Sequence, residues 1–512
     1  MIRTTPKNAA RRLEKPARTW LALASAAVLL AGCAGVRHDP LPAVPVPAQW
    51  AGAPVASTNP PAMPGPNAGV AASRVSMAST ASNPVDPVDP VDPLAAAIAP
   101  EFWRAFGDPV LDRLIGEVLA VNTDLAAAGI RAYRAQLQSG LADTNLTPSV
   151  SVNGKGGVSR TLDTQTMARS SSLNATAQYE VDLWGKLAAQ RDAARWEYEA
   201  TQADREAARL SIISQTAQYY WTLGYLNQII AYSQSNIAYA ERVVALARSR
   251  YAAGAVSALD VAQAEQSLAD QRATLTQQLQ QRTENRNALA ILFDRAPEQM
   301  AAEPSTLPTQ ALPDVPAGLP AELLGRRPDL RAAEWRLRES LANVDVTRTG
   351  FYPTFSLTGS LGTTSSTLER VLSNPIAALG AGLTLPFIQW NTMQLQIKVS
   401  QTQYEENVVN FRKSLYTALS EVENALSARD QLTRESEQRV LSLAQAQRAE
   451  SLLRSRYLAG AIDIQPWLQQ QKSLRDSQAA EAQVRLNRLN NRMALYKALG
   501  GAGNSVDANS PT

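Results

Sequence analysis

Strict alternation of apolar and polar residues marks two regions of the chain. From 172 to 183, the odd positions carry Leu, Ala, Ala, Tyr, Val and Leu, and the even positions carry Ser, Asn, Thr, Gln, Glu and Asp. At 354–361 Phe, Leu and Gly alternate with Thr and Ser, and 377–387 is apolar at its odd positions. Because a period of two places each kind of side chain on its own face of a strand, the pattern predicts two β-hairpins, at about 149–184 and 353–388.

A long stretch with no proline and almost no glycine follows each predicted hairpin, at 186–247 and 392–453. These stretches are rich in Ala, Gln, Leu, Arg and Glu, which favour helices. Sixty residues at about 1.5 Å each make a helix of roughly 90 Å, so the helices should lie side by side as in a coiled coil. Gly254 and Gly460 are expected to end them. The predicted helical hairpins span about 186–293 and about 391–499.

The chain contains an internal sequence repeat. Residues 246–294 and 452–500 align without gaps, and both segments contain Arg-Ser-Arg-Tyr followed two residues later by Ala-Gly-Ala. A repeat of this length predicts two similar structural units. Between them, residues 297–320 hold six prolines, which predicts a crossover connection. We therefore expect a first repeat at 101–296, a crossover and equatorial segment at 297–325, a second repeat at 326–500, and a disordered tail at 501–512.

The N-terminus combines six basic residues with the apolar run 20–30, which is too short to span a bilayer and is typical of an export signal. Leu30-Ala31-Gly32-Cys33 then resembles a bacterial lipobox, which implies cleavage after residue 32 and acylation of Cys33 with N-palmitoyl and S-diacylglycerol groups. Ala34 is not Asp, and by resemblance to sorted lipoproteins this favours the outer membrane. Residues 33–100, rich in Pro and Ala, are expected to form an extended tether.

Composition argues against several classes of function. The chain has one Cys and one His, and His38 lies in the predicted tether, so an internal disulfide is impossible and a Cys/His metal site is not expected. Removing residues 1–32 takes away six basic residues and Glu14, which leaves 43 basic and 45 acidic residues and gives no electrostatic case for nucleic-acid binding. No nucleophile–base pair or carboxylate pair stands out. We expect no enzyme activity and no cofactor besides the lipid on Cys33.

Aromatic residues stand at the inner ends of both predicted β-hairpins, Tyr179 with Trp184 and Phe387 with Trp390. They are typical of the interfacial girdle of a membrane barrel, although a half-exposed hairpin on a soluble core is the alternative. Four strands cannot leave open edges in lipid. Two chains would supply eight strands and a filled interior, whereas three chains would supply twelve strands and a water-filled bore, which the polar faces favour.

Several motifs in this order resemble the TolC/OprM outer-membrane efflux proteins, particularly the lipoprotein branch labelled NodT. They are Trp103-x-x-Phe106-Gly107-Asp108-Pro109, Asn122-x-Asp124-Leu125, Tyr179-Glu180-Val181-Asp182-Leu183-Trp184-Gly185-Lys186, Arg326-Arg327-Pro328-Asp329-Leu330 and two Arg-x-Arg-Tyr-x-x-Gly turns. The resemblance covers 101–499. It implies a mainly α chain with a membrane β-barrel portion, assembled as a homotrimer with a twelve-stranded barrel on a periplasmic helical tunnel. It also implies docking to a periplasmic adaptor and an inner-membrane pump of the resistance-nodulation-division type.

The resemblance also implies roles at the periplasmic tips, where the tunnel of such proteins closes and meets the adaptor. Gln469 stands where the family usually has Asp, which puts the usual acidic constriction in doubt. The alternative is that these residues are solvated side chains at helix ends. The candidate gate residues are Asp260, Gln465, Gln469, Arg250, Tyr251, Arg456 and Tyr457, and the candidate adaptor-contact turns are Gly254, Ala255, Gly460 and Ala461.

The sequence therefore predicts the outer-membrane channel of a tripartite efflux system, a passive duct for drugs or other small molecules. Most of the chain would be periplasmic, with a lipid anchor and a barrel in the outer membrane. Two alternatives stay open: an exit duct for type I secretion, and a coiled-coil structural lipoprotein without a pore. The transported substrates leave no mark in the sequence.

Overall fold

The computed structural model describes residues 101–163, 166–297, 301–315, 323–366 and 375–501, with Pro47, Trp50 and Ser373 besides. The predicted signal peptide, Cys33, most of the predicted tether, parts of the crossover and nearly all of the predicted tail lie outside these residues. The chain divides into two compact units. Among the residues from 101 onward, the first unit holds 131–202 and 332–412, and the second holds 101–130, 203–331 and 413–501.

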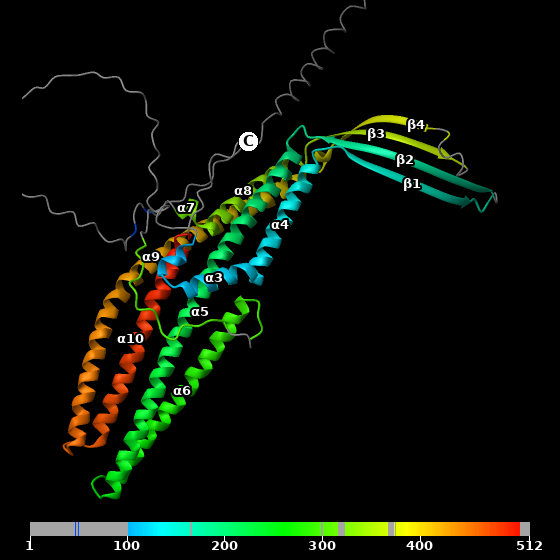
Figure 1. Ribbon diagram of the computed structural model, residues 1–512. Coiled ribbons are helices and arrows are strands. Elements are labelled where there is room, and N and C mark those ends of the chain that lie inside the picture. Colours follow the sequence, from blue (N-terminus) through cyan, green and yellow to red (C-terminus); the bar gives the residue numbers. More distant parts are fainter. Residues whose placement is uncertain are drawn as a thin grey trace, which may run out of the picture. The chain divides into compact units, whose positions relative to one another are not determined.

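Four antiparallel strands form the sheet of the first unit, in the order β1-β2-β3-β4 (Figure 1). The four predicted strands are thus confirmed. Their bounds are Ser149–Arg160 for β1, Met167–Val181 for β2, Thr354–Ser365 for β3 and Pro375–Thr384 for β4. β2 and β3 are neighbours although more than 170 residues separate them along the chain, so the two hairpins make one continuous sheet.

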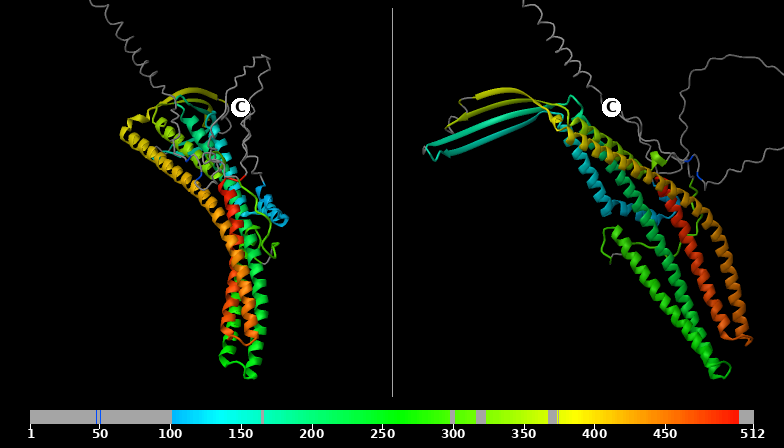
Figure 2. Two further views of the ribbon diagram at one scale, coloured as in Figure 1. Left: turned by 90° about the vertical axis from the view of Figure 1, so that its left-hand side faces the viewer. Right: turned by 180° about the vertical axis from the view of Figure 1, so that it is seen from behind.

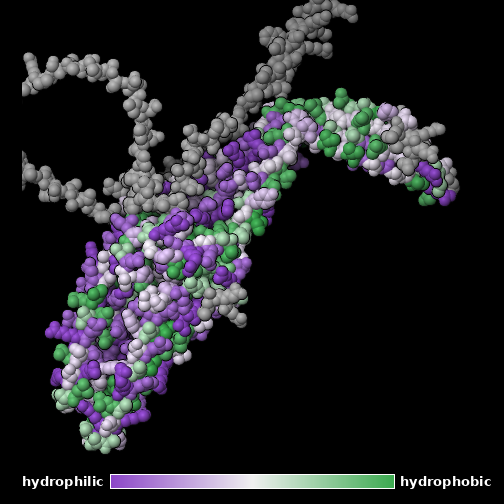
Figure 3. Space-filling model, in the orientation of Figure 1, coloured by the Kyte–Doolittle hydropathy of each residue, from purple (hydrophilic) through white to green (hydrophobic). Residues whose placement is uncertain are grey.

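The strand register gives this sheet one apolar and one polar face. Val150 lies opposite Ala177, Ala177 opposite Gly359, and Gly359 opposite Leu379. Residues that lie directly opposite each other share a face, so this row crosses all four strands on one side. In the next row, Thr176 lies between Ser151 and Ser360 on the other face. In Figure 3, hydrophobic residues gather over the sheet.

Four helices continue from the four strands of the first unit. α4 (Thr123–Thr144) leads into β1 and α8 (Pro328–Thr349) into β3, whereas α5 (Lys186–Ala252) follows β2 and α9 (Trp390–Leu458) follows β4. The helices expected after each hairpin are present, with 67 residues in α5 and 69 in α9. Among the described residues, no helix is sufficiently long and apolar to span a bilayer.

The alternating pattern at 377–387 extends past the end of the fourth strand. β4 ends at Thr384, and Pro386–Ile388 forms the short 3-10 helix η4. Pro386 has no backbone N–H to donate to a strand ladder and its φ suits the first turn of a helix. The second hairpin is therefore shorter than the sequence pattern indicates, and Phe387 and Trp390 lie beyond it.

The second unit holds α3 (Pro109–Val121), α6 (Ala258–Leu292) and α10 (Ile464–Ala498), with the remaining lengths of α5 and α9. The short helices η1 (Phe102–Phe106) and α7 (Leu323–Arg326) also belong to it. Asp108 caps α3 by accepting hydrogen bonds from the amides of Val110 and Leu111 at 3.0 and 3.2 Å, and it accepts another from the Tyr220 hydroxyl at 2.8 Å. These contacts account for the Gly-Asp-Pro motif of the sequence.

The described part of the crossover, 301–315, packs against α5 and α6 (Figure 2). The Asn227 side chain donates to the Pro304 carbonyl at 2.9 Å, and Arg286 pairs with Glu303. Gly224 lies in the middle of α5, where a Cβ atom would come within 2.9 Å of Pro304. The single glycine of this long helix therefore permits close approach of the crossover.

Candidate functional site at the helical-hairpin tips

Both helical hairpins of the second unit turn at a glycine in the left-handed conformation, Gly254 with φ of +69° and Gly460 with φ of +72°. The amides of Ala255 and Ala461 donate to the carbonyls of Arg250 and Arg456, both at 2.9 Å, which are the hydrogen bonds of a Schellman motif. A Cβ atom would meet nothing within 4 Å at either glycine. Glycine is therefore needed here for its conformation and not for space.

Arg250 links the tip of the first hairpin to that of the second. Its Nη1 atom donates to the carbonyl of Tyr457 and its Nη2 atom to the carbonyl of Leu458, both at 2.9 Å. Its guanidinium carbon also lies 4.7 Å from the centroid of the Tyr457 ring. The last carbonyls of α9 have no partner within the helix and carry partial negative charge, so the guanidinium both caps this helix and ties it to α5.

Tyr457 lies in an apolar cluster that joins the ends of all four long helices. Its ring stacks on Trp467 at 5.0 Å between centroids. Glu450 accepts hydrogen bonds from Trp467 Nε1 at 2.9 Å and from the Tyr239 hydroxyl at 3.2 Å. Burial raises the pKa of Tyr457, although Arg250 opposes this, and the Tyr457 hydroxyl has no hydrogen-bond partner among the described residues.

Sequence reasoning did not assign Trp467, Glu450 or Tyr239 to the tip. The cluster that contains them includes Val243, Val244, Ala247, Ala264, Tyr457, Ile464, Trp467 and Leu468. An apolar residue at every third or fourth position near the start of α10 is the one signal that could have located it.

The carboxylate of Asp260 is engaged within its own helix. It accepts hydrogen bonds from both the amide and the Oγ atom of Ser257, each at 2.9 Å. These contacts form a capping box at the start of α6. Tyr251 is exposed, and Arg456 is exposed with no side-chain hydrogen bond or ion pair within the described part of the chain. The structure therefore brings together Arg250 and Tyr457, whereas Asp260 forms no hydrogen bond with either of them and the side chains of Tyr251 and Arg456 are exposed.

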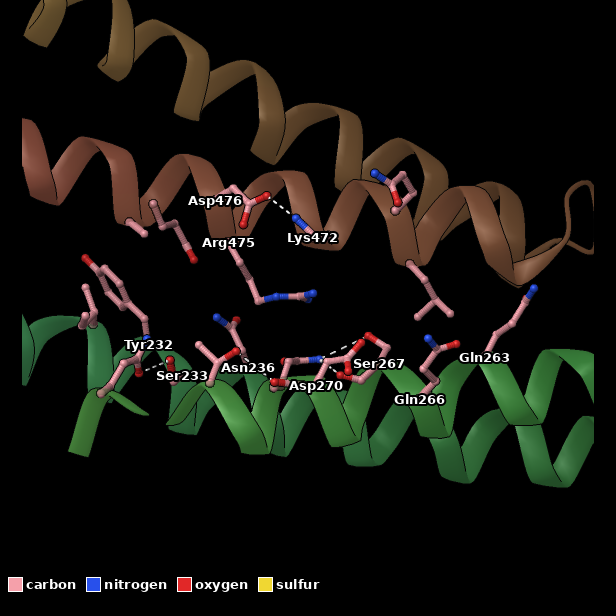
Figure 4. A pocket seen from close by; sticks show the side chains of 18 of the residues that line it. Tyr232, Ser233, Asn236, Gln263, Gln266, Ser267, Asp270, Lys472, Arg475 and Asp476 are labelled. Carbon is pink, nitrogen blue, oxygen red and sulfur yellow. Dashed lines mark hydrogen bonds and ion pairs between the residues drawn. The ribbon is translucent and has the colours of Figure 1, made fainter. Parts of the chain in front are cut away.

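Gln465 and Gln469 line an open cavity of about 440 Å³ between α5, α6 and α10. Both side chains are exposed and extend from α10 on the side of α6. Figure 4 shows this cavity, into which Arg475 extends from α10. The two candidate gate residues of α10 thus face a polar space and not the apolar cluster around Trp467.

The four aromatic residues expected at the membrane interface lie in two settings. Trp184 Nε1 donates to the Pro353 carbonyl at 2.7 Å, and its ring meets that of Tyr352 edge-on at 5.5 Å. Tyr179 lies opposite Leu357 on the apolar face of the sheet. Phe387 and Trp390 are 45% and 61% exposed. Trp184 therefore joins the two hairpins of the first unit, whereas Phe387 and Trp390 remain open to solvent or lipid.

A sheet with one apolar face continues into long paired helices, and the described residues contain no cluster of His, Cys, Asp and Glu that could hold a metal ion. At the tips, Arg250, Tyr457 and Glu450 all join helices to one another. An apolar sheet face that is exposed in the single chain needs a further surface to cover it, either lipid or protein.

Comparison with known proteins gives the family. A family model described as outer membrane efflux protein matches residues 114–293 and 319–501. Over 417 residues the chain is 33% identical to the pyoverdine export outer membrane protein OpmQ of Pseudomonas aeruginosa, covering 79% of this chain and 88% of that protein. Over 502 residues it is 30% identical to the probable efflux pump outer membrane protein TtgC of Pseudomonas putida, covering 94% and 96%.

The fold is also that of a solved channel. The crystal structure of the open state of the Neisseria gonorrhoeae outer membrane channel MtrE superposes with a TM-score of 0.66 and 29% identity, covering 77% of this chain and 89% of that one. The chain therefore belongs to the outer membrane efflux protein family. It is the outer-membrane component of an efflux system, as the motifs of the sequence predict.

Proposed function

We propose that three copies of this chain close their sheets into a twelve-stranded barrel and form a passive exit duct for small molecules. One observation carries the proposal: the sheet has a continuous apolar face, and its outer strands β1 and β4 each have an edge that pairs with no other described strand. In lipid such edges must pair, because no water is present to satisfy their backbone groups. Pairing β1 with β4 of the next copy satisfies both edges.

Exposed apolar residues on the outermost helices of the first unit support the same contact. α4 leads into edge strand β1, and its Tyr133, Leu137 and Leu141 are 61%, 52% and 65% exposed at a spacing of four residues. α9 follows edge strand β4, and its Leu395 and Val399 are 64% and 67% exposed. Both stripes lie on the helices that continue the sheet edges, so α4 of one copy would pack against α9 of the next.

Chemical cross-linking tests this arrangement. The double variant Leu137→Cys, Val399→Cys, treated with a flexible bismaleimide in the purified full chain, is expected to give covalent trimers on a denaturing gel. Each single variant should remain monomeric. Monomers alone from the double variant would refute the α4–α9 contact, and covalent dimers without trimers would refute three-fold closure.

The lipid anchor is a further part of the proposal, since Cys33 lies outside the described residues. Acyl chains contribute about 0.8 kcal/mol per buried CH₂ group, so the several chains of a lipoprotein hold it firmly. Replacing Cys33 with Ala is expected to abolish incorporation of labelled palmitate. Labelling that persists in this variant would show that the lipid is attached to another residue and would contradict the proposed anchor at Cys33.

The turns of Gly254, Ala255, Gly460 and Ala461 would meet a periplasmic adaptor coupled to a resistance-nodulation-division pump. Gln469 would then stand near the constriction in place of an acidic residue. Two unit charges a few ångströms apart at an effective dielectric near 20 interact by about 4 kcal/mol, and amides lack this interaction. Gln469→Asp is therefore expected to raise cation selectivity in planar-bilayer recordings, and unchanged selectivity would place the constriction elsewhere.

Two other functions remain to be distinguished. A type I secretion duct would co-purify with an adaptor of an ATP-driven exporter. A structural lipoprotein without a pore would give no ion conductance in planar bilayers. The names of the relatives OpmQ and TtgC, a pyoverdine exporter and an efflux pump protein, favour the efflux of small molecules.

A further inference from the structure

The polar cavity among α5, α6 and α10 is bounded along the helices by two apolar contacts. The cluster around Trp467 and Ala264 lies on the side of the tips. Leu226 and Ala482 belong to a second cluster beyond the other end of the cavity. Between them most of the lining residues have amide, hydroxyl or charged side chains, and Ile229, Leu468 and Ala479 are the apolar ones (Figure 4). The helices are therefore packed together at both ends of the cavity, with a space of about 440 Å³ between.

One cation in this cavity makes no direct ion pair among the described residues. Arg475 extends from α10 into the space (Figure 4), and its side chain forms no hydrogen bond or ion pair with any residue in the described ranges. Burial lowers the pKa of Arg475, and the carboxylates of Asp476 and Asp270 offset this only in part. Lys472, on the same helix, is satisfied by Asp476 at 2.7 Å. The positive charge of Arg475 is thus the least compensated in the cavity.

We infer that this cavity binds a small carboxylate that also carries hydroxyl or amide groups, with Arg475 as the cation that receives it. A guanidinium presents paired N–H donors whose planar geometry matches a carboxylate. The volume lies within the range of about 300–1,000 Å³ of small-molecule pockets. Gln266, Asn236 and Ser233, among the lining residues, supply donors and acceptors for the remaining groups of such a solute.

The inference rests on the proposed duct. Gln469, which the proposal places near the constriction, lines the same cavity, so solutes in the duct would have access to Arg475. Asp270 on the facing helix forms no ion pair in the described part of the chain and repels an incoming anion. Its presence keeps binding weak, which suits a passage that must release what it transports.

A binding titration on the purified full chain tests the site. The probe is gluconate, which combines a carboxylate with five hydroxyl groups, and glucose is the uncharged control. Saturation-transfer NMR is expected to detect gluconate and not glucose. Arg475→Gln should weaken gluconate binding by about tenfold or more. Lys472→Gln, which removes one positive charge from the same cavity but from an existing ion pair, should change it by less than about threefold. Asp270→Asn should strengthen it.

Two outcomes would overturn the inference that Arg475 receives a carboxylate. Equal binding of gluconate by the wild type and Arg475→Gln, or equal binding of glucose and gluconate, overturns the inference. Arg475→Lys keeps the charge without the planar fork and is expected to bind with intermediate affinity, which guards against a folding defect in Arg475→Gln. Conductance is measured on the same samples. Normal conductance without gluconate binding refutes this site alone, whereas absent conductance in all samples refutes the proposed duct.

Discussion

The contact of Arg250 with the end of α9 predicts how firmly the two hairpin tips are held together. Arg250→Gln removes two hydrogen bonds to carbonyls at 2.9 Å and a cation–π contact at 4.7 Å. Hydrogen bonds to a charged group contribute about 1.5–3 kcal/mol when buried, and a cation–π contact about 0.5–1 kcal/mol at an exposed site. Because Arg250 is only partly buried, we take about 2–3 kcal/mol for all three together.

Since about 1.4 kcal/mol changes an equilibrium tenfold, this loss shifts the ratio of separated to closed tips by roughly 30- to 150-fold. Single-channel recordings in planar bilayers measure it as an increase in the open fraction. Arg248→Gln is the matched control, because Arg248 lies in the same turn of α5 but binds Glu265 of the same hairpin, with both side chains exposed. Exposed pairs contribute about 0–1 kcal/mol, so this control should change the open fraction by at most about fivefold.

A variant of Tyr457 tests whether its hydroxyl contributes to the contact with Arg250. Tyr457→Phe keeps the ring and the backbone carbonyl but removes a buried hydroxyl that has no partner among the described residues. An unsatisfied buried hydroxyl destabilises, so this variant should leave the tips closed. If Arg250→Gln and Arg248→Gln gave the same open fraction, the apolar cluster around Trp467 alone would hold the tips, and Arg250 would serve only as a helix cap.

Three further predictions concern the turn, the sheet and the helices of the first unit. Gly460→Ala should lower the free energy of unfolding by about 1 kcal/mol, because φ at this residue is +72°. Gly116→Ala is the control inside helix α3 and should raise the free energy of unfolding by about 0.5–1 kcal/mol. Thermal unfolding measures both changes. Ala177→Arg on the apolar face should cost about 2–4 kcal/mol and impair membrane insertion, whereas Thr176→Arg on the polar face should insert, and equal insertion would contradict the assigned facing. Burial and a neighbouring carboxylate raise the pKa of Glu339 to about 6. The folded protein therefore binds the proton of the Glu339 carboxyl more tightly than the unfolded chain does. As a result, the free energy of unfolding should fall as pH rises from about 4.5 to about 6. After allowance for solvent screening the change is about 1 kcal/mol, and Glu339→Gln should abolish it in a series of unfolding curves against pH.

Local patterns predicted the elements of this fold well because the cause of each is local. The alternation at 172–183 identified β2, and helix formers after it identified α5. The alternating pattern predicted a strand at 385–387 that the structure does not contain. The odd positions there are apolar, but Pro386 begins a 3-10 helix. The backbone chemistry of proline decides there, and periodicity alone does not register it.

The tip contacts were harder to predict because their partners are distant or are backbone atoms. Arg250 binds the carbonyls of residues 457 and 458, and every residue offers such an acceptor, so no side-chain pattern could indicate the pair. The role of Asp260 could have been found, since Ser257 and Asp260 have the spacing of a capping box. The hydrogen bonds of Glu450 with Trp467 and Tyr239 bring together three helices, and sequence reasoning left them out.

The two turns have the same Arg-Ser-Arg-Tyr residues, yet the structure uses them differently. Arg250 of the first turn binds the second hairpin, whereas its counterpart Arg456 is exposed. Tyr457 of the second turn is 1% exposed, whereas its counterpart Tyr251 is 51% exposed. When two similar turns are related by translation, both point the same face in the same direction. The face that the first turn directs at the second is then the face that the second turn directs away from the first. The two turns therefore contact each other through different faces. One turn therefore contributes the cation and the other the ring and the carbonyls, and a repeat that is symmetric in sequence becomes an asymmetric contact.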